Sequence, residues 1–158
     1  MKHYFLTLLS LITFGRMCSA RLGETEAQIA ERYGQPLSIN PGFSDQHLVK
    51  NYIYKGFNIV VHFLDGKSSG ELFSKVIGDM ADTEIATLLA ANQPNGIWRL
   101  ISGNCMRGPI RWQLETNNVK WVAYYFGNTH TLAIAVKSFD EWYSNAGKTT
   151  NQGNLNGF

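Results

Sequence analysis

The feature that most constrains the fold of this chain is a helix-like segment that occurs twice. Residues 24–36 read ETEAQIAERYGQP, and residues 82–94 read DTEIATLLAANQP. Both segments begin with an acidic residue and Thr-Glu, both end in Gln-Pro, and both carry apolar residues at helical spacing. They predict two short helices, over roughly residues 25–33 and 83–91.

The ends of the first helix are marked by residues with known capping roles. Thr25 and Gln28 have the Thr-x-x-Gln spacing of a capping box, in which each side chain satisfies a backbone N–H of the first turn. Gly34 suits the left-handed conformation that ends many helices, and Pro36 prevents the helix from continuing. We therefore expect Gly34 at positive φ.

The second helix and a third, C-terminal one carry weaker signals. Asp82 or Thr83 is expected to cap the second helix, and Asn92 stands where the first segment has Gly34. Residues 138–146, SFDEWYSNA, predict a third short helix that begins at a serine cap. The polar, Gly- and Asn-rich residues 147–158 are expected to form a disordered tail.

Strand-like segments separated by turn residues follow each of the first two helices. Lys55-Gly56 and Asp65-Gly66 divide residues 51–76, and Asn117-Asn118 and Gly127-Asn128 divide residues 110–139. The pattern predicts an α+β fold of two tandem units, residues 21–77 and 78–146, each a helix followed by an antiparallel meander. The natural packing is one sheet layer, or two sheets joined edge to edge, with the helices on one face.

The first twenty residues have the pattern of a secretory signal peptide. Lys2 provides a basic start, residues 5–14 form a mostly apolar run, and Cys18-Ser19-Ala20 places small residues before a cleavage site. A run of ten residues is too short to cross roughly 30 Å of hydrocarbon. The residues before Cys18 do not fit a lipidation motif. We expect cleavage after Ala20 and a secreted or periplasmic protein.

Removal of that leader changes the cysteine and charge inventory. Cys105 would be the one cysteine left, so an intramolecular disulfide cannot form. Of the 14 Lys and Arg residues, Lys2 and Arg16 would be lost, which leaves 12 basic and 12 acidic residues. A chain with this balance offers no electrostatic reason to bind nucleic acid or an anionic membrane.

The first unit carries a motif that points to a known family. Its pattern is Gly-x-Thr-x-x-Gln-Ile and Tyr-Gly-x-Pro over residues 23–36, and Phe-Leu-Asp-Gly over residues 63–66. This resembles the SmpA/OmlA outer-membrane-assembly lipoproteins, directly over residues 22–67. The doubled helix-meander arrangement is similar to the tandem fold of the β-lactamase inhibitory proteins. The resemblance implies a protein that binds other proteins and performs no chemistry, and no functional residue is carried over.

Residues that could support catalysis or metal binding are scattered. Cys105 lies in a Gly-rich stretch before Pro109 without a recognisable nucleophile motif, so a small packed residue or a loop thiol is the simpler interpretation. Asp45 and His47 form an Asp-x-His pair that we expect in a surface loop, without metal. His62 and His130 are expected on strands, half exposed. The sequence therefore predicts no catalytic residue, no metal site and no cofactor.

The C-terminal hairpin is apolar on both faces and provides the candidate binding surface. One face must contact the helices, while the other is either covered by the C-terminal helix or left open for a partner. Aromatic residues dominate the energetics of many protein interfaces. The residues predicted to form the binding face are Val122, Tyr124, Phe126, Leu132 and Ile134.

These observations favour a binding protein of the cell envelope. The expected partner is another envelope or secreted protein, bound through a sheet face without catalysis. The alternative is a small secreted enzyme that uses Cys105 or a carboxylate in a cleft between the two units. A third alternative, a carrier of small molecules, would require a closed apolar pocket.

Overall fold

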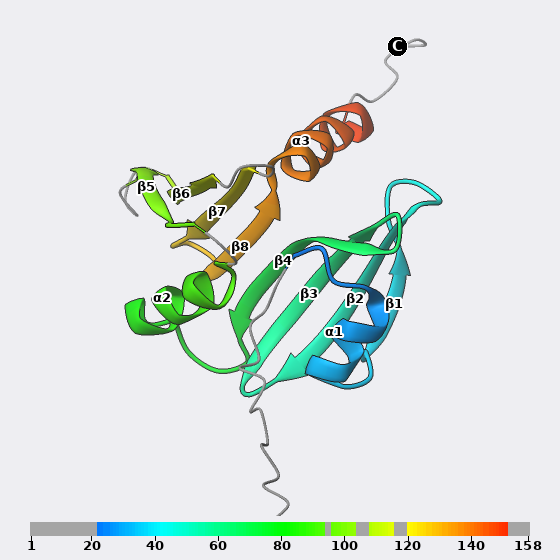
Figure 1. Cartoon of the computed structure of the whole chain (residues 1–158), viewed down its shortest axis with the longest axis horizontal. Coiled ribbons are helices and arrows are strands. Elements are labelled where there is room, and N and C mark those ends of the chain that lie inside the picture. The colour runs from blue at the N-terminus through cyan, green and yellow to red at the C-terminus, as the bar shows by residue number, and fades with distance from the viewer. Residues whose placement is uncertain (1–21, 94–95, 104–107, 116–119, 152–158) are drawn as a thin grey trace, which may run out of the picture.

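The computed structural model describes residues 22–93, 96–103, 108–115 and 120–151. Within these residues the chain forms three helices and eight strands (Figure 1). Their order is α1 (Glu26–Tyr33), β1 (Ser38–Pro41), β2 (His47–Tyr54), β3 (Phe57–Leu64), β4 (Lys67–Lys75), α2 (Asp82–Ala91), β5 (Arg99–Ser102), β6 (Ile110–Glu115), β7 (Lys120–Phe126), β8 (Thr131–Val136) and α3 (Lys137–Asn151).

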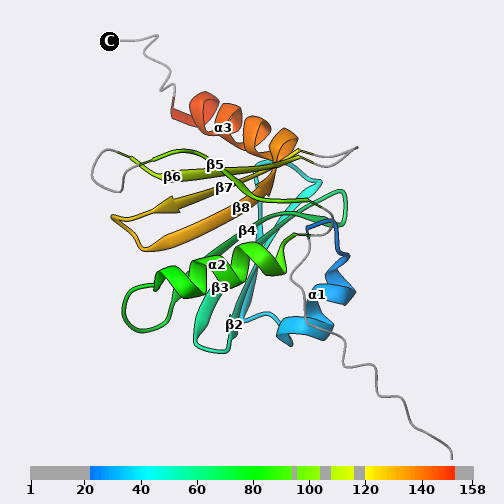
Figure 2. The same cartoon turned by 60° about the vertical axis from the view of Figure 1, so that its left-hand side comes forward.

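All eight strands belong to one antiparallel sheet, which confirms the α+β class. The order across the sheet is β1-β2-β3-β4-β8-β7-β6-β5, so β4 and β8 join the first four strands to the last four. β4 and β8 pair through Gly70 with Ala135 and Phe73 with Leu132. Figure 2 shows β5–β8 running across the view while β2 and β3 run up it, as expected for a strongly twisted sheet.

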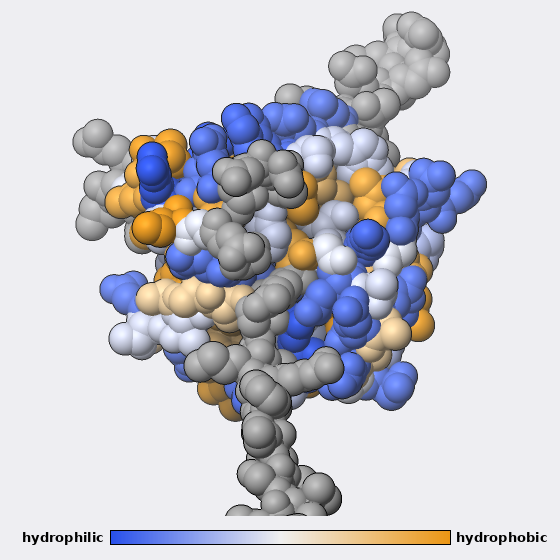
Figure 3. Space-filling model, viewed as in Figure 1, coloured by the Kyte–Doolittle hydropathy of each residue, from blue (hydrophilic) through white to orange (hydrophobic). Residues whose placement is uncertain are grey.

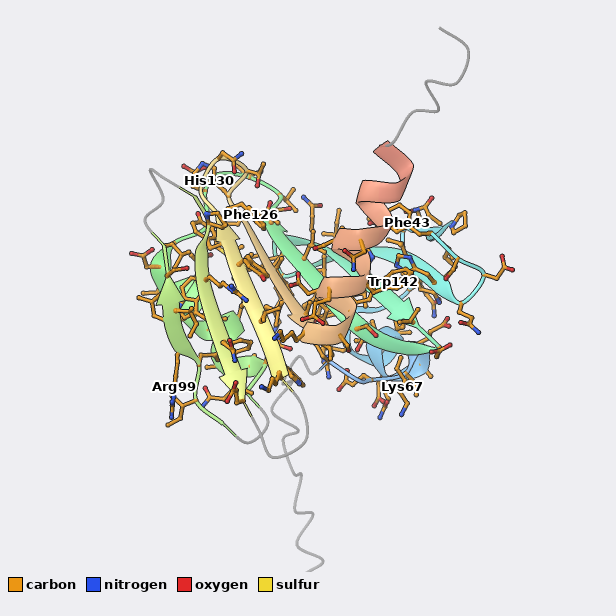
Figure 4. The ribbon with its side chains drawn as sticks, turned by 90° about the horizontal axis from the view of Figure 1, so that it is seen from above. Phe43, Lys67, Arg99, Phe126, His130 and Trp142 are labelled. Atoms are coloured by element: carbon orange, nitrogen blue, oxygen red, sulfur yellow. The ribbon has the colours of Figure 1, made fainter. Side chains whose placement is uncertain are left out.

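The helices lie on both faces of this sheet, α1 and α2 on one and α3 on the other (Figures 1 and 4). We call the side under α1 and α2 the core face, because it carries the main hydrophobic cluster with Ile29 of α1 and Ile85 of α2. Alternate strand residues supply this cluster, and each fully buried apolar side chain contributes about 1.5–3 kcal/mol. One row of residues paired in register across five strands comprises Tyr52, Ile59, Phe73, Leu132 and Tyr125.

The start of α1 is capped as the sequence predicts. The Thr25 Oγ1 accepts the Gln28 backbone N–H at 3.4 Å, and the Gln28 Oε1 accepts the Thr25 backbone N–H at 2.9 Å. Gly34 at its end has the expected positive φ of 87°, but its ψ of −164° makes it extended rather than left-handed helical. The extended turn directs the chain toward β1.

The predicted N-cap of α2 is wrong, and Asn92 ends the helix as predicted but in a different conformation. The helix begins after Ala81, because the Glu84 side chain reaches back and accepts the Ala81 backbone N–H at 2.8 Å. Neither Asp82 nor Thr83 is the N-cap. At the other end Asn92 has a φ of −99° instead of a left-handed conformation, and its buried side chain donates to the Leu88 carbonyl at 3.2 Å.

The third helix is longer than predicted and starts without a linker. It follows β8 directly at Lys137 and continues to Asn151, so residues 147–151 are helical instead of belonging to a disordered tail. Gly147 costs such a helix about 1 kcal/mol relative to alanine without ending it. None of the helices in the described part of the chain is both long and apolar enough to cross a membrane.

Candidate functional site

The five residues predicted to form one binding face lie on opposite faces of the sheet. Val122, Tyr124 and Phe126 are on the side of α3, whereas Leu132 and Ile134 are fully buried in the core face. The turn between β7 and β8 sets a register in which opposed residues share a face, and a shift of one residue exchanges the faces. The pairs are Val122–Ala135, Tyr124–Ala133, Phe126–Thr131, Tyr125–Leu132 and Ala123–Ile134.

Helix α3 covers one end of the face on its side, which we call the α3 face. Phe139 is 5% exposed and lies over Gly70, where an added Cβ would be 2.8 Å from the phenylalanine ring. Val122 lies in the same row of the sheet as Gly70 and is fully buried. The Tyr124 hydroxyl donates to the Asp140 carboxylate of α3 at 3.0 Å. The helix therefore covers one of the three predicted residues on this face and contacts a second.

The other end of the α3 face is open and forms a continuous surface across the sheet. One row of residues paired in register crosses seven strands, and every member is partly or fully exposed. Farther from α3, Ile53 is 51% exposed and Phe126 is 37% exposed. We call this surface the platform; it consists of Ser38, Asn51, Val60, Leu72, Ala133, Tyr124 and Arg111 together with Ile53 and Phe126.

The aromatic end of the platform is organised by three side chains. The Tyr124 and Phe126 rings stack with centroids 6.2 Å apart and an interplanar angle of 27°. The Arg111 guanidinium lies over the Tyr124 ring, 5.6 Å from its centroid. Such a cluster presents a rigid apolar surface beside a guanidinium, which is the combination found at many protein interfaces.

Two buried histidines lie under α3, where the sequence predicted exposed or half-exposed side chains. His47 is 3% exposed and His62 is 7% exposed. The His47 Nδ1 accepts the backbone N–H of Phe43 at 3.0 Å, and the His47 Nε2 lies 3.0 Å from the His62 Nδ1. His47 is thus the first residue of β2 and part of a packed cluster instead of a surface loop.

Aromatic rings from α3 and from the β1–β2 turn enclose this pair. The Trp142 ring meets the His47 ring edge-on at 5.1 Å, and the Phe139 ring lies 5.5 Å from the His62 ring. Phe43 contacts Trp142 at 6.3 Å, and Figure 4 shows the two labelled side chains on the same side of the sheet. The histidines therefore join β2 and β3 to α3.

The environment of the pair favours neutral imidazoles. Burial lowers the pKa of His62 to about 4, and the adjacent His47 lowers it further in the same direction. Burial also lowers the pKa of His47. Because neutral imidazole has one N–H, the bond accepted from Phe43 places the His47 proton on Nε2, which then donates to His62 Nδ1.

The strand pairing that brings His47 and His62 together is set by a turn that can be recognised in the sequence. The two-residue turn Lys55-Gly56 fixes the β2–β3 hairpin so that Val49 opposes His62. His47 lies two residues before Val49 and shares its face. The proximity of His47 and His62 was not predicted, because β2 begins at His47, inside a segment whose sequence resembles a long loop.

A second buried polar cluster lies on the core face under α1. Glu71 is fully buried, and its Oε2 accepts the Tyr33 hydroxyl at 3.1 Å. Burial raises the pKa of Glu71 to about 7. Arg32 and Glu24 form an ion pair beside it. Glu71 therefore joins β4 to α1 through its bond to Tyr33 and has no exposed surface.

Within the described part of the chain, the remaining candidate residues are not gathered into one site. His130 lies in the β7–β8 turn with a φ of 48°, not on a strand, and its Nε2 is 3.4 Å from the Asp79 carboxylate. Cys105 lies outside the described residues. Among the residues that the structure describes, no three His, Cys, Asp or Glu side chains are grouped so that they could hold a metal ion.

Exposed apolar side chains also gather at the edge of the sheet formed by β5, where Figure 3 shows a group of orange atoms. Ile97, Leu100 and Ile101 are 74%, 63% and 52% exposed.

Comparison of the chain with protein-family models, curated proteins and solved structures found no significant match.

Proposed function

We propose that this chain is a non-catalytic module, secreted or periplasmic, that binds another protein of the cell envelope through the platform. The observation that carries the proposal is the row of exposed residues that crosses seven strands and ends in the Tyr124–Phe126 stack. Helices α1 and α2 cover the core face and α3 covers one end of the opposite face, and none of them covers this row. The leader-like residues 1–20 support export.

The chemistry of the platform favours a protein over a charged ligand. Its centre, formed by Val60, Leu72 and Ala133, is apolar, and Arg111 is the single ionisable group in the row apart from Tyr124. Interface centres are depleted in charge and enriched in aromatic residues and arginine. Nucleic acid or an anionic membrane would require many more cations.

The proposal extends to the architecture of the chain: the sheet that carries the platform would consist of two tandem units. Each unit would comprise a helix and four strands, α1 with β1–β4 and α2 with β5–β8. The strand order, in which β4 and β8 meet at the centre while β1 and β5 form the edges, supports a doubled arrangement. A shared ancestral unit would account for the two similar helix segments in the sequence.

Binding can be tested with partners captured from envelope extract and then purified. Phe126→Ala should weaken the affinity by about 1–2 kcal/mol, because Phe126 presents an exposed ring that stacks on Tyr124. Ile77→Ala removes a more exposed apolar side chain outside the platform and is the matched control. Equal affinity of the two variants, with unchanged circular dichroism, would exclude the platform as the binding surface.

A further inference from the structure

We infer that α3 is a displaceable cover, latched by the neutral His47–His62 pair, and that acidification releases it from the α3 face. The release is a property of this chain alone. Its consequence, a larger surface for the partner, rests on the function proposed above. Two features of the structure carry the inference: the way α3 is seated on the histidines, and the hydrogen-bond chain that holds them.

The N-terminal part of α3 packs through aromatic rings on both imidazoles. Phe139 lies 5.8 Å from the His47 ring and 5.5 Å from the His62 ring, and Trp142 lies 5.1 Å from the His47 ring. The imidazoles stack on one another at 5.2 Å. A change in the position of either imidazole therefore alters the surface on which the helix packs.

The hydrogen-bond chain admits only neutral rings. The Phe43 N–H points to His47 Nδ1 and the His47 Nε2–H points to His62 Nδ1, each over 3.0 Å. A proton added to His47 would place an N–H against the Phe43 N–H. A proton added to His62 would place an N–H against that of His47. Either event replaces a hydrogen bond with two opposed donors in a buried site, which is strongly unfavourable.

The charged groups on the neighbouring elements do not offset this effect. Asp45 and Asp65 lie in exposed turns, and Glu71 is bonded to Tyr33 on the core face. On α3, Asp140 accepts the Tyr124 hydroxyl, and Glu141 is 3.6 Å from Lys137. The residues with charged side chains on the elements and turns packed against the pair are Asp45, Lys50, Asp65, Lys67, Glu71, Lys75, Lys137, Asp140, Glu141 and Lys148.

The platform alone is smaller than a typical protein interface, and displacement of α3 would enlarge it. Seven strands spaced about 4.8 Å apart span about 29 Å, and one row of residues extends about 7 Å along the strands, with Ile53 and Phe126 extending it at two positions. The platform therefore offers less than about 400 Å², under half of the roughly 800 Å² per partner in a specific interface. Displacement of α3 would add the adjoining row, which contains Val122 and Gly70.

Hydrogen exchange of the full chain, followed by mass spectrometry, tests the release without any partner. At about pH 5, after correction for the chemical exchange rate, amides of residues 138–146 should open at least about tenfold more often than at about pH 7.5. Amides of β3 and β7 should keep their protection. Imidazole ¹⁵N shifts of His47 and His62 should change with the same midpoint as the exchange of α3.

Substitutions test whether His47 and His62 cause the pH response of α3. His47→Gln combined with His62→Asn removes both titrating rings and should abolish the pH response of α3. His130→Gln removes a half-exposed histidine of the β7–β8 turn and should leave the response unchanged. If the double variant does not fold, the wild-type midpoints and the His130 control decide the question.

Three results would overturn the inference. The first is equal protection of α3 at both pH values, and the second is simultaneous loss of protection in α3, β3 and β7, which is global unfolding. The third is a response that His130→Gln abolishes. None of these results involves the partner, so they are distinct from a failure of Phe126→Ala to weaken binding, which would reject the platform while leaving the latch intact.

Discussion

A Cβ atom added to Gly70 would lie 2.8 Å from the Cε1 of Phe139, so α3 approaches the sheet where β4 has no side chain. The same Cβ would lie 3.7 Å from the Cβ of Ala135, which is ordinary contact. The small residues at these paired positions form the site that receives the Phe139 ring. This close approach is one of the contacts that place α3 on the sheet, beside the packing of Trp142 on His47 and the bond from Tyr124 to Asp140.

We expect Gly70→Ala to displace α3 without changing the histidines. The added methyl group must move a buried ring, so α3 should exchange its amide protons faster at about pH 7.5, where the wild-type helix is closed. Overpacking of this kind costs about 1–3 kcal/mol. Ser69→Ala, one residue earlier, is the control. Unchanged exchange of α3 in Gly70→Ala would mean that Phe139 does not hold the helix in place.

The two similar helices should respond differently to loss of their threonines. Thr25→Ala removes the side chain that caps α1 and should lower the free energy of unfolding by about 1 kcal/mol. Thr83→Ala should have little effect, because the N-cap of α2 is Ala81 and the Glu84 side chain accepts the Ala81 backbone N–H. Urea denaturation measures both. Equal losses would show that Thr83 caps α2 after all.

Gly34→Ala tests the turn that ends α1. The combination of φ 87° and ψ −164° is almost exclusive to glycine, so alanine should lower the free energy of unfolding by about 1–3 kcal/mol. Nothing lies within 4 Å of the added Cβ, so a loss would arise from backbone strain and not from a clash. A neutral result in urea denaturation would contradict the observed conformation.

Local signals in the sequence predicted the α+β class and the first helix with its cap. Thr25 and Gln28 act within one turn, and the Lys55-Gly56 and Asp65-Gly66 hairpins depend on adjacent residues, so a single sequence is enough to find them. The cap of α2 was predicted wrongly because Ala81 resembles no N-cap. Its hydrogen bond comes from Glu84, whose role depends on the backbone geometry.

The rest of the site could not be predicted, because it depends on long-range register. The strands β1 and β5 are four residues long and fully exposed, so they lack the alternation that reveals a strand. The assignment of Leu132 and Ile134 to the wrong face came from the pairing across the β7–β8 turn. The meeting of α3 with His47 and His62 is a contact between distant elements, which no local pattern encodes.

Buried Glu71 and His62 make opposite contributions to stability in nearly the same pH range. The pKa of Glu71 is raised from 4.5 to about 7, so the folded state binds more protons and the free energy of unfolding falls as pH rises across that window. The pKa of His62 is lowered from 6.5 to about 4, so the free energy of unfolding rises with pH between those values. Each shift corresponds to about 3 kcal/mol, and the two effects largely cancel between about pH 4.5 and 6.5.

Glu71→Gln should remove the contribution of Glu71 to the pH dependence of stability and leave that of His62. The variant keeps an acceptor for the Tyr33 hydroxyl but has no charge to bury, so its stability should rise with pH from about 4.5 to 7, by up to about 3 kcal/mol more than that of the wild type. Urea denaturation at the two ends of the range measures the difference, with Glu31→Gln on the exposed side of α1 as the control. A constant difference between variant and wild type would show that Glu71 does not titrate in this range.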